Sequence, residues 1–297
     1  MAPIETHFVS ANGLRFEVEQ CGSGDRLALC LHGFPECSYS WRYQMPLLAE
    51  QGYRVWAPNL RGYGRSSRPP KIADYRTDLL LADIAALIEA SHCQSVLLIG
   101  HDWGAALAWL FAIGKVHPLE GLIIMNVPHP VPFLKCLKTW KQLGRSWYIL
   151  FFQIPWLPEW LLSRGNGWLL GKAMRYMAMD NNRFPDEVIN VYRHHAVQPG
   201  ALRAMVNYYR ALFREAPWRK SHDYEPAIEV PTLMIWGEED LALGKETTYG
   251  TEHYVNDLSL HYLPGVSHWV QQEAPEQVNN LILEWLSKKI KTHSTPS

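Results

Sequence analysis

The stretch "LLIGHDWGAALAW", residues 97–109, decides the fold prediction. An apolar run ends at Gly100, a short turn follows, and from Gly104 onward the composition favours a helix. This strand–turn–helix order, with a glycine on each side of the turn, is typical of a nucleophile elbow. The residue at its centre is Asp102, whose carboxylate would lie beside the positive end of the helix. On this stretch alone, a simple helix cap is an equally good interpretation of Asp102.

Six short apolar runs alternate with longer helical patterns along the chain. Such runs predict strands buried on both faces, and the helices between them predict an α/β fold with a mainly parallel sheet. An Asn12-Gly13 turn between two alternating segments predicts an opening hairpin. The expected parallel strands are 26–31, 53–58, 95–100, 121–126, 231–236 and 258–263.

The alternation of strands and helices stops between about residues 130 and 218. This stretch has no clear strand pattern, several amphipathic helical patterns and many aromatic residues. We therefore expect a helical cap at 130–218, inserted between a first core segment, 1–129, and a second, 219–297.

The composition argues against several functional classes. Lys and Arg number 28 and Asp and Glu 29, so no basic surface for nucleic acid is expected. Prolines interrupt the most apolar stretch, 147–162, which argues against a membrane span. No signal peptide is visible and the five cysteines are scattered, so we expect reduced thiols and a cytoplasmic location. The pair His194-His195 lacks companions at ligand spacing, so neither a metal nor another cofactor is expected.

Two further loops supply the partners that a nucleophilic Asp102 would need. A triad on this kind of sheet runs along the chain as nucleophile, acid and histidine. Asp240 follows the run 231–236, and His268 follows the last run. Both are expected at the carboxyl ends of parallel strands, where such sheets form their active sites. Glu239 is the second choice for the acid. This order favours catalysis over capping.

A third loop, His32-Gly33-Phe34-Pro35, follows the first expected parallel strand. Its position predicts that the Phe34 N–H faces the elbow. Together with the N–H of Trp103, it would form an oxyanion hole.

Taken together, these segments resemble the soluble epoxide hydrolases of the α/β-hydrolase superfamily. The resemblance rests on HGFPE at 32–36, RGYG at 61–64, GHDWG at 100–104, the late Asp240 and SHW at 267–269. It extends over almost the whole chain, including the cap, and implies hydrolysis of an epoxide to a vicinal diol.

The resemblance also implies two cap tyrosines that hold the epoxide oxygen. They correspond to Tyr148 in "SWYILFFQIP" and Tyr209 in "NYYRALF". Helical periodicity independently favours Tyr209, because it lies on an apolar stripe whereas Tyr208 is about 100° away around the helix. Tyr148 rests on the resemblance, because its segment is apolar nearly all round.

Chemistry explains why a carboxylate stands where related enzymes have a hydroxyl. A serine attacking an epoxide would form an ether, whereas Asp102 forms an ester that water can hydrolyse. The reference pKa of aspartate is about 3.9, so the nucleophile needs no base. His268, oriented by Asp240, would then activate a water against the ester. The aromatic cap favours apolar epoxides, aryl-substituted ones included. The residues expected to contact the substrate are Phe34, Trp103, Phe151 and Trp156.

Other interpretations stay open. A haloalkane dehalogenase also uses an elbow aspartate and a neighbouring tryptophan, but it needs two side-chain N–H donors for halide, and Phe34 has none. A non-catalytic ligand-binding protein could use the same fold. The aromatic cap surface is compatible with a homodimer but does not require one.

Overall fold

The computed structural model describes residues 2–137, 139–215 and 227–290. Eight strands form one sheet in the order β1-β2-β4-β3-β5-β6-β7-β8. The pairs β1/β2 and β2/β4 are antiparallel and all the others are parallel. The strands are β1 (Glu5–Ala11), β2 (Leu14–Cys21), β3 (Arg26–Leu31), β4 (Tyr53–Pro58), β5 (Ser95–His101), β6 (Gly121–Met125), β7 (Thr232–Gly237) and β8 (Leu258–Leu263).

These strands confirm the six expected parallel segments to within a residue or two. The opening hairpin is confirmed as well. Ala11 pairs with Leu14, and both Asn12 and Gly13 have positive φ, as a two-residue hairpin turn requires.

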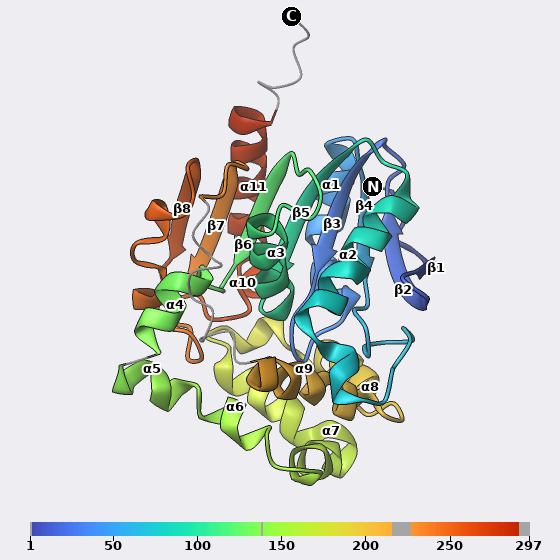
Figure 1. Ribbon diagram of the computed structural model, residues 1–297, viewed down its shortest axis with the longest axis vertical. Helices are drawn as coiled ribbons and strands as arrows, with labels where there is room; N and C mark the ends of the chain where they lie inside the picture. Colours follow the sequence, from blue (N-terminus) through green and yellow to red (C-terminus); the bar gives the residue numbers. More distant parts are fainter. Residues whose placement is uncertain (1, 138, 216–226, 291–297) are drawn as a thin grey trace, which may run out of the picture.

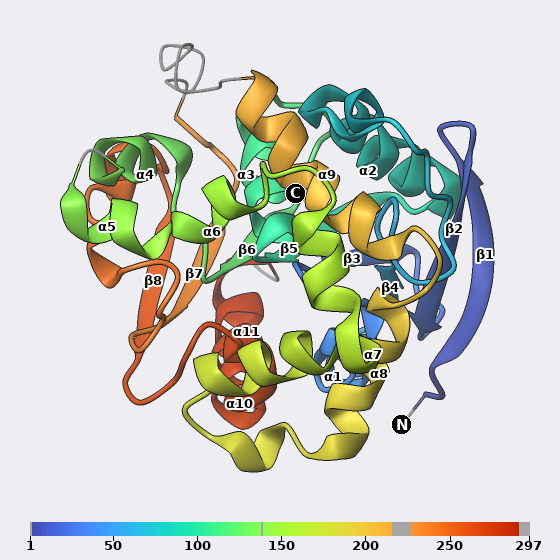
Figure 2. The same ribbon diagram turned by 90° about the horizontal axis from the view of Figure 1, so that it is seen from below.

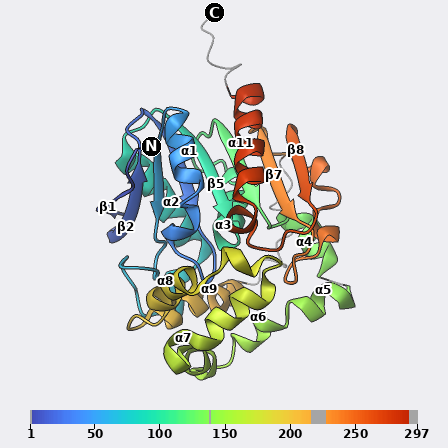
Figure 3. The same ribbon diagram turned by 180° about the vertical axis from the view of Figure 1, so that it is seen from behind.

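Helices cover both faces of the sheet. Figures 1 and 3 show α2 and α3 on one face and α1 and α11 on the other. Two apolar cores correspond to this arrangement, one under each helical layer. The helices of the core are α1 (Gln44–Glu50), α2 (Thr77–Ser91), α3 (Trp103–Ile113), α10 (Val270–Glu273) and α11 (Pro275–Lys289).

The described chain between β6 and β7 forms helices, and no strand is found among its described residues. Helices α6 to α9 lie across one end of the sheet (Figure 2). The end of the expected cap, 216–218, and the start of the second core segment, 219–226, lie outside the described residues. The helices are α4 (Pro130–Cys136), α5 (Trp140–Arg145), α6 (Trp147–Phe151), α7 (Leu157–Met177, kinked at 164–167), α8 (Asp186–Ala196) and α9 (Ala201–Glu215).

No helix in the described part of the chain is both long and apolar enough to cross a bilayer.

Helix α3 approaches β3 very closely at Gly104. A Cβ at this position would lie 2.0 Å from the backbone carbonyl oxygen of Leu31. Because that neighbour is backbone of a central strand, it cannot move aside cheaply. The glycine therefore lets the helix that follows the elbow pack directly on the sheet.

We predict that Gly104→Ala lowers the free energy of unfolding by roughly 1 to 3 kcal/mol, because the added methyl overpacks the core. Urea denaturation would measure the change. Gly144→Ala is the matched control, since a Cβ there meets nothing within 4 Å and Gly144 is exposed on a helix. It should not destabilise the protein. Equal losses in the two variants would contradict this account.

Candidate active site

The elbow holds Asp102 between β5 and α3 in a strained conformation. Its φ is 48° and its ψ is −122°, outside the region that L-residues ordinarily adopt. The side chain projects toward the loop after β3, where a Cβ on Gly33 would lie 2.2 Å from the Asp102 Cβ. The Phe34 N–H donates to Asp102 Oδ1 at 2.6 Å. One carboxylate oxygen is thus held by a backbone amide, as expected for one half of an oxyanion hole.

The expected triad residues meet at the carboxyl ends of β5, β7 and β8. His268 Nδ1 lies 2.6 Å from Asp240 Oδ2. His268 Nε2 lies 3.6 Å from Asp102 Oδ2, close enough for an ion pair but longer than a hydrogen bond. The imidazole therefore lies between two carboxylates, facing the Asp102 oxygen that Phe34 does not hold.

Asp240 is fixed in its buried position by four donors. Besides His268, Asn126 Nδ2 donates to Oδ2 at 2.8 Å, and the N–H groups of Ala242 and Leu243 donate to Oδ1. Glu239, the alternative acid, is exposed. The geometry thus favours Asp240 as the partner of His268.

The charges of this array are strongly coupled. Burial alone would lower the pKa of His268, but the negative charges of Asp240 and Asp102 and the hydrogen bond to Asp240 outweigh it and raise the pKa to about 10. Burial would raise the pKa of Asp102, but His268 and the Phe34 amide outweigh it and keep that pKa below its usual value. At neutral pH the array is therefore an imidazolium between two carboxylates.

The two expected tyrosines lie together on the cap side of Asp102. The rings of Tyr148 (α6) and Tyr209 (α9) are 5.9 Å apart, and Tyr209 also contacts Trp103 at 5.0 Å and Phe34 at 5.5 Å between ring centroids. Burial and then the negative charge of Asp102 raise the pKa of both hydroxyls above the usual tyrosine value. Both side chains are therefore protonated hydrogen-bond donors at neutral pH.

The neighbouring Tyr208 has a different environment. Its hydroxyl donates to the backbone carbonyl of Arg61 at 2.8 Å, and its ring packs on Tyr63, Tyr75 and Trp103. Tyr208 thus ties α9 to the core, while Tyr209 remains on the side of Asp102.

The aromatic residues expected near the substrate divide into two groups. Phe34 and Trp103 lie beside the tyrosines, whereas the ring contacts of Phe151 among the described residues are with Trp147 and Phe152. Phe152, which the sequence did not single out, is the residue that contacts Phe34, Tyr148 and Tyr209. The segment is apolar on all sides, so periodicity could not distinguish the two phenylalanines.

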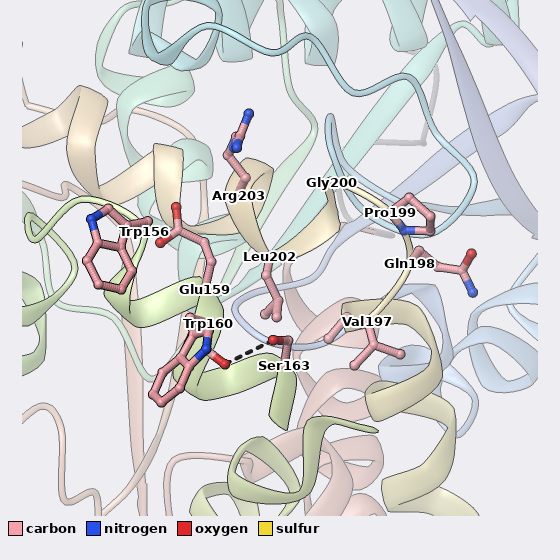
Figure 4. Close-up of a pocket in the computed structure, with 11 residues that line it drawn as sticks. Trp156, Glu159, Trp160, Ser163, Val197, Gln198, Pro199, Gly200, Leu202 and Arg203 are labelled. Carbon is pink, nitrogen blue, oxygen red and sulfur yellow. Dashed lines mark hydrogen bonds between the residues drawn. The ribbon is translucent and has the colours of Figure 1, made fainter. Parts of the chain in front are cut away.

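Trp156 requires a correction. Its side chain is 71% exposed and lines a surface cavity of about 470 Å³ on the cap, together with Glu159, Trp160 and Arg203 (Figure 4). None of the residues lining this cavity is a triad residue or one of the two tyrosines. Trp156 directly precedes α7, and its indole points outward.

Sequence reasoning also missed a buried network under the elbow. His101, next to the nucleophile, lies with Nδ1 2.7 Å from Glu36 Oε2 and Nε2 2.8 Å from the backbone carbonyl of His268. Glu36 also accepts from the side chains of Gln271 and Gln272. The position of Glu36 in the "HGFPE" motif could have marked it as a residue near the site. Only the fold, however, brings Glu36 to the loop that carries His268.

Among the residues that the structure describes, no group of three or more His, Cys, Asp or Glu side chains is arranged to hold a metal ion.

Comparison with known proteins agrees with this geometry. The family described as alpha/beta hydrolase fold matches residues 29–275. The AB hydrolase superfamily protein YfhM of Bacillus subtilis is 38% identical over 97% of this chain and 100% of its own length. Epoxide hydrolase 4 of Homo sapiens is 38% identical over 95% of this chain and 78% of its own. The crystal structure of Bacillus megaterium epoxide hydrolase in complex with an inhibitor matches with a TM-score of 0.87 and 31% identity, over 95% of this chain and all of that one.

These matches confirm the expected fold, and together with the elbow they place the chain in the epoxide hydrolase family of the α/β-hydrolase-fold enzymes.

Proposed function

We propose that the protein hydrolyses apolar epoxides, aryl-substituted ones included, to vicinal diols through a covalent ester on Asp102. The observation that carries this proposal is the arrangement of a nucleophilic carboxylate between a charged His268–Asp240 pair and two protonated tyrosines. The epoxide hydrolases among the relatives support the reaction class. The aromatic side chains around the tyrosines support an apolar substrate. We also propose that residues 130–218 act as the cap that carries the tyrosines.

In the first step, Asp102 Oδ2 attacks an epoxide carbon while Oδ1 stays bound to the Phe34 amide. A carbon–oxygen bond to Asp102 forms, the ring carbon–oxygen bond breaks, and its electron pair moves to the epoxide oxygen. Tyr148 and Tyr209 donate hydrogen bonds to that oxygen, and one of them supplies its proton. The raised pKa of each tyrosine means that both hydroxyls are protonated, and can donate, when the epoxide binds at neutral pH.

In the second step, the ester on Asp102 is hydrolysed. Esterification removes the negative charge of Asp102, which is one of the causes of the raised His268 pKa. The imidazolium then gives up its proton more readily, and the tyrosinate left by the first step takes it up, directly or through water. The neutral ring can now take a proton from water. The hydroxide attacks the Asp102 carbonyl carbon, and the amides of Phe34 and Trp103 stabilise the oxyanion. The bond between the Asp102 carboxyl carbon and the oxygen bound to the substrate then breaks, and His268 returns its proton to that oxygen. The diol leaves with an original Asp102 oxygen, and the net reaction adds one water to the epoxide.

We predict that Asp102→Ala lowers diol formation from styrene oxide by more than about a thousandfold, because the covalent step has no other nucleophile. Chromatographic diol analysis would measure it, with circular dichroism to show that the variant is folded. In a single turnover in heavy-oxygen water, the wild-type diol should be unlabelled and the label should appear in Asp102. Label in that first diol would rule out the ester.

We predict that Tyr148→Phe and Tyr209→Phe each slow ring opening by about 10²- to 10³-fold, the usual cost of removing one donor to a developing oxyanion. Stopped-flow fluorescence would follow formation of the alkyl-enzyme. Tyr208→Phe is the matched control, because it removes a hydroxyl that bonds to the Arg61 carbonyl. It should lower stability by about 1 kcal/mol without slowing ring opening. A larger kinetic effect in the Tyr208 variant than in the Tyr209 variant would refute the assignment.

The two steps should depend differently on pH. Ester hydrolysis needs neutral His268, so its rate should increase as the pH rises and then level off at a pH below about 10, the pKa of His268 when Asp102 is charged. Ring opening needs ionised Asp102 and protonated tyrosines, so it should be nearly flat between about pH 6 and pH 9. Single-turnover rates of both steps across this range would test the prediction. Hydrolysis that slows with rising pH would contradict the role of His268 as base.

A further inference from the structure

Tyr148 lies on a helix that cannot fix its own position. Helix α6 spans only Trp147–Phe151, which is five residues, and isolated helices of this length are unstable in water. Tyr209, by contrast, lies on the 15-residue helix α9. The spacing of the two hydroxyls therefore depends on what ties the end of α6 to α9.

Arg210, the residue after Tyr209, makes that connection. Its Nε donates to the carbonyl of Phe152 at 2.9 Å, and its Nη2 donates to the carbonyl of Ile154 at 2.8 Å. These carbonyls follow α6 and have no further turn of that helix to bind them. The Arg210 side chain is only 9% exposed, so each of these hydrogen bonds is largely shielded from water.

Glu159, in the first turn of α7, completes the contact. Its two carboxylate oxygens accept from Arg210 Nη1 at 2.6 Å and Nη2 at 3.1 Å, and its side chain is 17% exposed. The carboxylate neutralises the buried guanidinium and orients its plane. Glu159 also borders the outer cap cavity (Figure 4).

A reciprocal contact runs in the opposite direction. Gln153 Nε2 donates to the carbonyl of Tyr209 at 3.3 Å and to the carbonyl of Ile149 at 2.9 Å. Phe152, whose carbonyl accepts from Arg210, contacts both Tyr148 and Tyr209 with its ring. Two side chains thus join α9 to the end of α6. Arg210 on α9 binds the carbonyl of Phe152, and Gln153 after α6 binds the carbonyl of Tyr209.

We propose that Arg210 is a positioning residue for epoxide ring opening. This proposal rests on the function proposed above. Held by Glu159, it sets the distance and orientation between the Tyr148 and Tyr209 hydroxyls without touching the substrate. The role requires arginine. One planar guanidinium donates hydrogen bonds to three acceptors, the Phe152 carbonyl, the Ile154 carbonyl and the Glu159 carboxylate. A lysine ammonium cannot reproduce this planar arrangement of donors. Ester hydrolysis does not depend on the Arg210–Glu159 pair, because the groups it uses lie in the core: His268, Asp240 and the Phe34 amide.

The test compares the two single-turnover steps with styrene oxide in wild type and Arg210→Lys. Ring opening should slow by about tenfold to a hundredfold, the effect of displacing a reacting group by about 1 Å. Hydrolysis of the alkyl-enzyme, once formed, should stay within about twofold of wild type. Arg203→Lys is the matched control, because Arg203 lies on the same helix but is exposed at the outer cavity. It should change neither step.

A purely structural role gives a different result. If Arg210→Lys is folded and both steps keep wild-type rates, or both fall by the same factor, the proposal is wrong. If Arg210→Lys does not fold, Glu159→Gln decides by the same criteria, since it keeps the shape of the side chain and removes the charge. Failure of the wild type itself to form an alkyl-enzyme would instead overturn the proposed function, independently of Arg210.

Discussion

The negative charge of Asp102, held in a largely buried turn at the end of a parallel strand, is the constraint on which the rest of the site depends. Such a charge persists only where donors and a counter-charge replace water. Here the loop after β3 supplies the Phe34 amide, and the loop after β8 supplies His268. The loop after β7 supplies Asp240, which orients the imidazole. Because these strands run parallel in one sheet, their carboxyl ends bring all three loops to the elbow.

The interaction between the charges of Asp102 and His268 also sets the order of the two proposed steps. While Asp102 is ionised, His268 is held as an imidazolium and cannot act as a base. Once the carboxylate becomes an ester, one of the charges that held the proton is gone. A base is then available at the stage that needs one, and the network of His101 and Glu36 keeps the His268 backbone in place throughout.

Core and cap contribute different kinds of group. The described core supplies charges and backbone amides from the loops at the carboxyl ends of β3, β5, β7 and β8. The cap contributes neutral donors, Tyr148 and Tyr209, in an aromatic layer whose low polarity keeps their hydroxyls protonated. The short helix α6 owes its order to side chains that bind backbone carbonyls after it, as Arg210 of the longer helix α9 does.

The sequence by itself determined the elements that follow from local physics. Apolar runs identified the parallel strands, two glycines identified the elbow, chain order selected Asp240 and His268, and helical periodicity separated Tyr209 from Tyr208. The choice of Phe152 over Phe151, the outward position of Trp156, and the roles of Asn126, Glu36 and Arg210 came only from the tertiary structure. Periodicity cannot orient a short helix that is apolar all round. A buried polar side chain acquires its partners from residues far away in the chain, as Glu36 does from Gln271 and Gln272, 235 and 236 positions later. Those contacts exist only after the sheet and the cap have packed.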